Sequence, residues 1–188
     1  MKKLCYLLFC FSSLTLANTE LVTAAMQRLE HIVIYDGSYQ TIAYPNGDVS
    51  KFKGVCTDVI IRSYRTLGID LQQLVHEDMQ ANFKLYPQIW GLKKPDTNID
   101  HRRVPNLEKF LQRKGETLII SNNPKDYKPG DIVSWRLDNN LPHIGIVSNT
   151  KSSSNPNRYK IIHNIGWGPK LDDMLFDYKI VGHFRYPP

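Results

Sequence analysis

Hydrophobic residues recur three or four positions apart in four stretches of the chain, which predicts four helices. The predicted helices cover residues 20–30, 56–67, 70–84 and 105–114. Gly68 and Gly115 follow the second and fourth of them and are typical helix terminators, while Pro105 suits a first helical turn. The second helix therefore begins at Cys56, which places this side chain at a helix N-terminus.

The C-terminal third changes to short runs rich in β-forming residues, separated by turn residues. The predicted strands cover residues 131–136, 143–148, 159–164 and 179–186, and one further strand is expected at 31–35. The polar segment 151–158 is predicted to be a hairpin loop between neighbouring strands, and 86–104 an irregular loop. The pattern predicts an α+β fold in which N-terminal helices pack on a C-terminal antiparallel sheet.

The N-terminus has the pattern of a secretory signal. Lys2 and Lys3 precede an apolar run over 4–16 that is too short to span a bilayer, and Ala17 suits signal cleavage. We therefore expect a signal peptide at 1–17 and a single domain at 18–188, in the periplasm or secreted from a bacterium. A retained N-terminal anchor is the alternative, but no stable membrane insertion is expected after cleavage.

The composition is mildly basic and does not predict a nucleic-acid-binding protein. There are 24 lysines and arginines against 18 acidic residues, and the basic count falls to 22 once the signal is removed. These basic residues are scattered rather than gathered in a dense run, although a modest positive field suits an anionic polymer such as a cell wall. We expect a monomer.

No metal site is predicted. His76, Asp78, Asp96, Asp100 and His101 are potential ligands, but their spacing matches no zinc motif. We expect the chain to work without a metal or another cofactor.

The positions of the cysteines say more about function than the charge does. Cys5 and Cys10 belong to the predicted signal, so Cys56 is left without an intramolecular partner in a compartment where disulfides form. Such a thiol can pair with another chain, pack as a small apolar side chain, or act in catalysis.

Two histidines support catalysis. A helix N-terminus favours the thiolate of Cys56, and a histidine on a neighbouring strand can act as its base while a third residue orients the imidazole. His143 begins one predicted strand and His163 ends the next, so an antiparallel hairpin can bring them side by side. The pattern predicts Cys56 as nucleophile and His143 as base.

Four segments together resemble the motifs of NlpC-type papain-like cysteine peptidases, which cut peptidoglycan stem peptides. They are GVCTD at 54–58, KPGDIVSW at 128–135, HIGIV at 143–147 and IIHN at 161–164. The resemblance implies a papain-like domain in which Cys56 attacks an amide bond, His143 is the base and His163 orients it. Common members have Asp-Cys-Ser-Gly at the nucleophile and lack the long insertion before the sheet. The chain is most similar to an uncharacterised exported branch marked by a stretch such as DTNIDHRRVPN at 96–106.

The insertion supplies a second set of candidate residues. Asp100, His101, Arg102 and Arg103 crowd one irregular loop, and arginine suits bidentate recognition of the carboxylates that stem peptides carry. We hypothesise that these residues bind substrate, and that Trp167 lines the cleft beside His163. The alternative is that the charged groups only hold the loop together through ion pairs.

Three other functions are compatible with the sequence. Acyl transfer or deamidation would use the same three catalytic residues. A non-catalytic wall-binding protein would use Cys56 only for packing, and a partner of another envelope enzyme would have no activity alone.

Overall fold

The computed structural model describes the backbone of residues 9–187 and the side chains of residues 18–187. The helices are α1 (Phe9–Gln27), α2 (Cys56–Thr66), α3 (Leu71–Asn82) and α4 (Val104–Lys114). The three predicted helices after the N-terminal one are confirmed to within two residues at each end. Gly68, just after α2, has a positive φ of 77°, a conformation that glycine adopts without steric cost.

Helix α1 differs from its prediction at both ends. It begins at Phe9, so the helical backbone continues through the predicted cleavage position after Ala17, and residues 28–30 form a 3₁₀ turn instead of its last turn. Residues 1–8 of the predicted signal lie outside the described part of the chain, and cleavage stays a prediction. Among the described residues, no helix is long and apolar enough to cross a membrane.

A six-stranded sheet has the order β3-β8-β4-β5-β6-β7, and each neighbouring pair is antiparallel. Its strands are β3 (Glu116–Thr117), β4 (Ile132–Arg136), β5 (Pro142–Lys151), β6 (Tyr159–Asn164), β7 (Pro169–Asp172) and β8 (Lys179–Arg185). The α+β class and the antiparallel sheet are confirmed. The edge strands β3 and β7 were not predicted, because they are only two and four residues long and carry few β-forming residues.

A second, two-stranded sheet pairs β1 (Ile34–Tyr35) with β2 (Lys53–Gly54) in parallel. The strand predicted at 31–35 is reduced to these two residues. Tyr35 is the register partner of Gly54, so the pairing places Tyr35 beside the segment that leads into α2.

Within residues 9–187, five short 3₁₀ turns join these elements. They are η1 (Arg28–Glu30), η2 (Phe83–Leu85), η3 (Asp100–Arg102), η4 (Pro124–Asp126) and η5 (Asp138–Asn140). The turn η3 lies in the insertion between α3 and α4.

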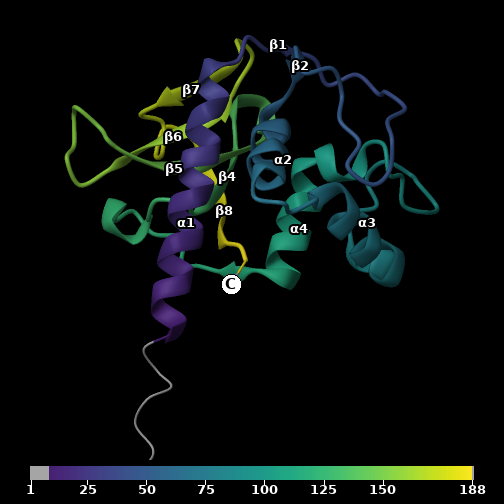
Figure 1. The fold of residues 1–188 in the computed structure, drawn as a ribbon, viewed down its shortest axis with the longest axis horizontal. Helices are drawn as coiled ribbons and strands as arrows, with labels where there is room; N and C mark the ends of the chain where they lie inside the picture. Colours follow the sequence, from purple (N-terminus) through teal and green to yellow (C-terminus); the bar gives the residue numbers. More distant parts are fainter. Residues whose placement is uncertain (1–8, 188) are drawn as a thin grey trace, which may run out of the picture.

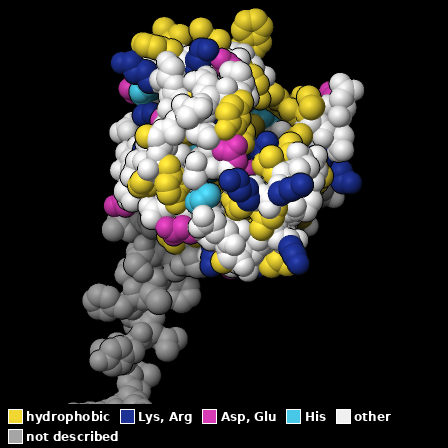
Figure 2. Space-filling view, turned by 90° about the vertical axis from the view of Figure 1, so that its right-hand side faces the viewer, with side chains coloured by type: hydrophobic (Ala, Val, Ile, Leu, Met, Phe, Trp, Pro, Cys, Tyr) yellow, Lys and Arg dark blue, Asp and Glu magenta, His cyan; other side chains and the backbone are white. Residues whose placement is uncertain are grey.

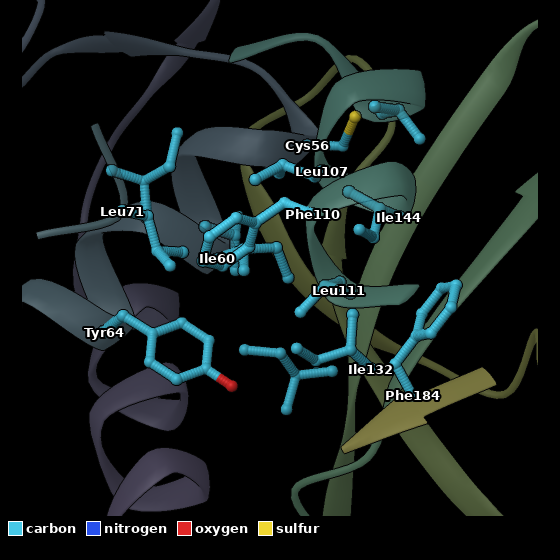
Figure 3. Close-up of a cluster of buried hydrophobic side chains, with 14 of the residues drawn as sticks. Cys56, Ile60, Tyr64, Leu71, Leu107, Phe110, Leu111, Ile132, Ile144 and Phe184 are labelled. Atoms are coloured by element: carbon cyan, nitrogen blue, oxygen red, sulfur yellow. The ribbon is translucent and has the colours of Figure 1, made fainter. Parts of the chain in front are cut away.

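Helices α2, α3 and α4 lie together beside the sheet, and α1 packs against α2 and β5 (Figure 1). One cluster of buried side chains joins all four helices to one face of the sheet, and it includes Cys56 and Ile144 (Figure 3). A second cluster covers the other face and includes Trp135 and Val147. Successive side chains of β5 therefore alternate between the two clusters, as the pleat of a strand requires.

Candidate functional site

Cys56 is the first residue of α2, and its position is fixed by the contacts of the first helical turn. The Asp58 carboxylate accepts a hydrogen bond from the Val55 N–H at 2.6 Å, and the Thr57 hydroxyl donates to the Arg102 carbonyl at 3.0 Å. The cysteine is only 4% exposed. It lies at one end of its cluster, with the sulfur pointing away from the other labelled side chains (Figure 3).

The thiol is neutral at ordinary pH in this arrangement. Burial raises the pKa of Cys56 to about 12, against a lowering by the Ile144 backbone, which hydrogen-bonds to the sulfur. The nearby Asp58 carboxylate raises the pKa further, and the backbones of Thr57 and Cys56 itself lower it. The helix N-terminus therefore supplies hydrogen-bond donors to the sulfur, but burial dominates.

The two histidines lie side by side, as the hairpin arrangement predicts. His143 Nε2 is 2.9 Å from His163 Nδ1, and His163 Nε2 is 3.1 Å from an Asp172 carboxylate oxygen. The three side chains come from β5, β6 and β7, so they form a hydrogen-bonded row across one edge of the sheet. Asp172 was missed from the sequence because the strand that carries it was not predicted.

This row fixes the proton positions of both rings. The Asp172 carboxylate accepts the hydrogen bond from His163, so His163 carries its proton on Nε2 and accepts at Nδ1. His143 must then donate from Nε2, which leaves its Nδ1 as an unprotonated, basic nitrogen. The arrangement makes Nδ1 the nitrogen of His143 that can accept a proton.

Both rings are 1% exposed and are held closely by their neighbours. A Cβ atom on Gly145 would lie 3.1 Å from the His163 Cβ and 2.7 Å from a methyl group of Ile161, so only glycine lets β5 approach here. The Trp135 ring lies against His143 with a centroid separation of 5.9 Å.

Burial also keeps the imidazoles neutral. It lowers the pKa of His143 to about 3, with a further lowering from His163. Burial likewise lowers the pKa of His163, although its bond to Asp172 acts in the opposite direction.

Cys56 and His143 are not hydrogen-bonded to each other, although the start of α2 contacts the start of β5. Across residues 18–187, the sulfur makes no hydrogen bond to either histidine; it contacts the backbone of Ile144, the residue that follows His143. Proton transfer requires the thiol and the imidazole to come within hydrogen-bonding distance of each other.

Tyr35 is a further residue beside the thiol that the sequence did not reveal. Burial raises its pKa to about 12, and the neighbouring Cys56 and Asp58 contribute to the rise, partly through a hydrogen bond with Cys56. The residue remains 44% exposed, so Tyr35 lies at the surface beside the buried thiol. Only the pairing of β1 with β2 brings it there.

The candidate substrate-binding residues of the insertion contact the chain itself. Arg102 is 6% exposed and forms a bidentate ion pair with Asp58, with both N–O distances at 2.9 Å. It also donates to the carbonyl of Asp36, the residue after Tyr35, at 3.2 Å. Arg102 thus joins the insertion to the first turn of α2 and to the Tyr35 segment.

The neighbouring insertion residues have similar contacts. Arg103 pairs with Asp100 at 3.1 Å and lies over the Trp90 ring. His101 is 2% exposed, and burial lowers its pKa to about 4, with Arg102 adding to the lowering. These contacts match the alternative in which charged groups hold the loop together, and substrate binding by them stays a prediction.

Trp167 is 90% exposed, at the turn between β6 and β7. Exposed Ile32, Ile34 and Phe52 lie on and beside β1 and β2. Hydrophobic side chains gather along the top of Figure 2, the end of the molecule at which Figure 1 places β1, β2 and β7. Among residues 18–187, no group of three His, Cys, Asp or Glu side chains is arranged to hold a metal ion.

Comparison with known proteins gives three findings. Residues 22–186 match the model of DUF1287, a family described as a domain of unknown function. The uncharacterized protein YijF of Escherichia coli K12 is 52% identical over 172 residues, which is 90% of this chain and 83% of YijF. The crystal structure of an N-acetylmuramoyl-L-alanine amidase from Bacteroides uniformis is similar in fold, with a TM-score of 0.53 and 13% identity over 90% of this chain and 97% of that chain.

Proposed function

We propose that this chain, which belongs to the DUF1287 family, is an exported cysteine hydrolase that cleaves an amide bond in peptidoglycan peptides. The observation that carries the proposal is the position of Cys56 at the start of α2, where its sulfur contacts the backbone of Ile144, together with the hydrogen-bonded row His143–His163–Asp172 that begins one residue earlier on β5. The similarity in fold to a protein named as a muramoyl-alanine amidase supports an amide of the cell wall as the substrate. We also propose that the domain is papain-like, of the NlpC type.

The reaction begins when the substrate carbonyl carbon meets the Cys56 sulfur. His143 Nδ1 takes the thiol proton as the carbon–sulfur bond forms, and the carbonyl becomes a tetrahedral oxyanion. His143 then gives that proton to the leaving amine, and the carbon–nitrogen bond breaks to leave a thioester. Water attacks the thioester, His143 takes one proton from the water and returns it to the thiol, and the acid product leaves.

The other groups of the site stabilise the charges that form in this reaction. His163 and Asp172 hold the His143 ring in the tautomer with a basic Nδ1, and they stabilise the imidazolium that forms. The backbone N–H of Cys56 at the helix N-terminus and the Tyr35 hydroxyl are the proposed donors to the oxyanion. The raised pKa of the thiol means that proton transfer accompanies attack, rather than preceding it.

The test is mass spectrometry of purified peptidoglycan and its soluble fragments after incubation with residues 18–188. Wild-type protein is expected to release new fragments, and Cys56→Ala should reduce their rate of release at least ~10³-fold. Asp172→Asn keeps the size of the side chain and should leave an intermediate rate. Equal release by wild type and Cys56→Ala, or no release by either, would contradict the proposal.

A further inference from the structure

A cationic pocket lies beside the segments that carry Cys56 and His163. It encloses about 290 Å³ between η1 and the segment that follows it, the segment before α2, one side of α2, the last residue of β6 and the first residue of β7. This volume is close to that of sites that bind small organic ligands. Four of its lining side chains are cationic and two are acidic: Arg28, Lys51, Arg62 and Arg65, with Asp48 and Asp58.

The two carboxylates are already occupied. Asp48 is shared by Arg62 and Arg65, at 2.9 and 3.0 Å. Asp58 is engaged by Arg102, which does not line the pocket. The acidic groups therefore leave part of the positive charge of the pocket without a partner.

Arg28 is the pocket residue whose positive charge has the fewest partners. Its guanidinium forms no hydrogen bond or ion pair with any residue in the described part of the chain, and its Nε is buried without a partner. The Nε of Arg65 is also buried and unpartnered. Burial and the nearby Arg62 lower the pKa of Arg28, against a smaller raising by Asp48 and Glu30, so the neighbouring guanidinium group disfavours its charge. Lys51 likewise has no ion pair with the side chains of residues 18–187, and it lies over the Phe52 ring.

The pocket is adjacent to the catalytic residues along two segments. Val55, which precedes the nucleophile, and Asn164, which follows His163, both line it. The Asn164 side chain donates to the Gly54 carbonyl at 3.4 Å and so joins the two segments. A ligand held in the pocket would lie beside the peptide being cleaved.

We propose that the Arg28 pocket, lined by Arg28, Lys51, Arg62 and Arg65, binds a carboxylate of the peptide substrate. The assignment of the anion to the substrate rests on the proposed function. Arginine forms charge-assisted hydrogen bonds to carboxylates, and an unpartnered, partly buried guanidinium group such as that of Arg28 gains most from such a ligand. The pocket would therefore select peptides with a free carboxylate over peptides in which that group is amidated.

The experiment measures binding by calorimetry to Cys56→Ala protein of residues 18–188, which cannot cleave its ligand. The two probes are a synthetic wall stem peptide with free carboxylates and the same peptide with those groups amidated. The free peptide is expected to bind at least ~10-fold more tightly. Adding Arg28→Gln or Lys51→Ala should remove most of this preference, while Lys84→Ala, which removes an exposed lysine outside the pocket, should not.

Equal binding of the two peptides, no binding of either, or a preference that survives both pocket variants would overturn the proposal. Inorganic phosphate is the competing probe: if it binds in an Arg28-dependent way and the peptide does not, the ligand is not a peptide carboxylate. Thermal unfolding checks that each variant is folded. Carboxylate-dependent binding without cleavage by wild type would refute the proposed hydrolysis but not the pocket, whereas cleavage without the preference would refute the pocket alone.

Discussion

At the residue scale, Tyr35 gives the most direct test of the geometry around the thiol. Its hydroxyl is proposed to donate to the oxyanion, so Tyr35→Phe should lower kcat about 10²-fold with little change in KM. The measurement is the rate of fragment release as a function of substrate concentration. Tyr39→Phe is the matched control, because that exposed hydroxyl contacts Asp96 instead of the thiol. An unchanged kcat for Tyr35→Phe would remove the hydroxyl from the mechanism.

The ionisation of Cys56 gives a second prediction at this scale. Because burial raises the thiol pKa from 9.0 to about 12, the reactive thiolate is scarce at neutral pH and becomes more abundant as pH rises. In the free protein, the alkylation rate by iodoacetamide should be about 10³-fold below that of free cysteine at pH 7 and should still be rising at pH 10. A plateau below pH 8 would show instead a thiolate–imidazolium pair in the free protein.

At the element scale, Arg102 distinguishes the two interpretations of the insertion. Removal of its side chain leaves Asp58 buried without its partner, so Arg102→Ala should lower the free energy of unfolding by about 3–5 kcal/mol. Arg103→Ala is the neighbouring control and should cost about 1 kcal/mol or less, because that ion pair is partly exposed. Urea titrations measure both. If Arg102→Ala has wild-type stability but no longer binds the peptide, the insertion recognises substrate.

The elements that the sequence predicted are those with a long, regular pattern. Helix α2 and strand β6 each bury a periodic set of apolar residues, so their bounds follow closely from the sequence, and with them the positions of Cys56 and His163. The pattern gives no such signal for β7 or β1, which are short and stabilised by pairing with a neighbour. Asp172 and Tyr35 lie on those strands, and for this reason the sequence did not identify them.

Long-range charge pairing was likewise not predictable. The insertion residues form a conspicuous charged group in the sequence, yet the contact between Arg102 and Asp58 spans 44 positions. The Arg28 pocket is assembled from still more distant segments, and no local motif marks it. The sequence showed which residue types were present but not which cations would lack a partner.

At the scale of the whole molecule, α1 is expected to be part of the folded domain from Asn18 onward. Leu21, Val22 and Ala25 are at most 1% exposed, and Leu21 and Ala25 belong to the cluster that contains Cys56. Because these side chains cover α2 and the sheet, a chain of residues 28–188 should lose cooperative unfolding, whereas residues 18–188 should retain it.

Within the chain of residues 18–188, Leu21→Ala should lower the free energy of unfolding by about 2–5 kcal/mol, since it opens a cavity in the main core. Thr23→Ala is the control on the exposed side of the same helix, and its effect should stay within about 0.5 kcal/mol. Urea unfolding followed by circular dichroism measures both variants. If residues 28–188 unfold at the same urea concentration as residues 18–188, the domain begins after α1 and the packing of this helix contributes nothing to the positioning of Cys56.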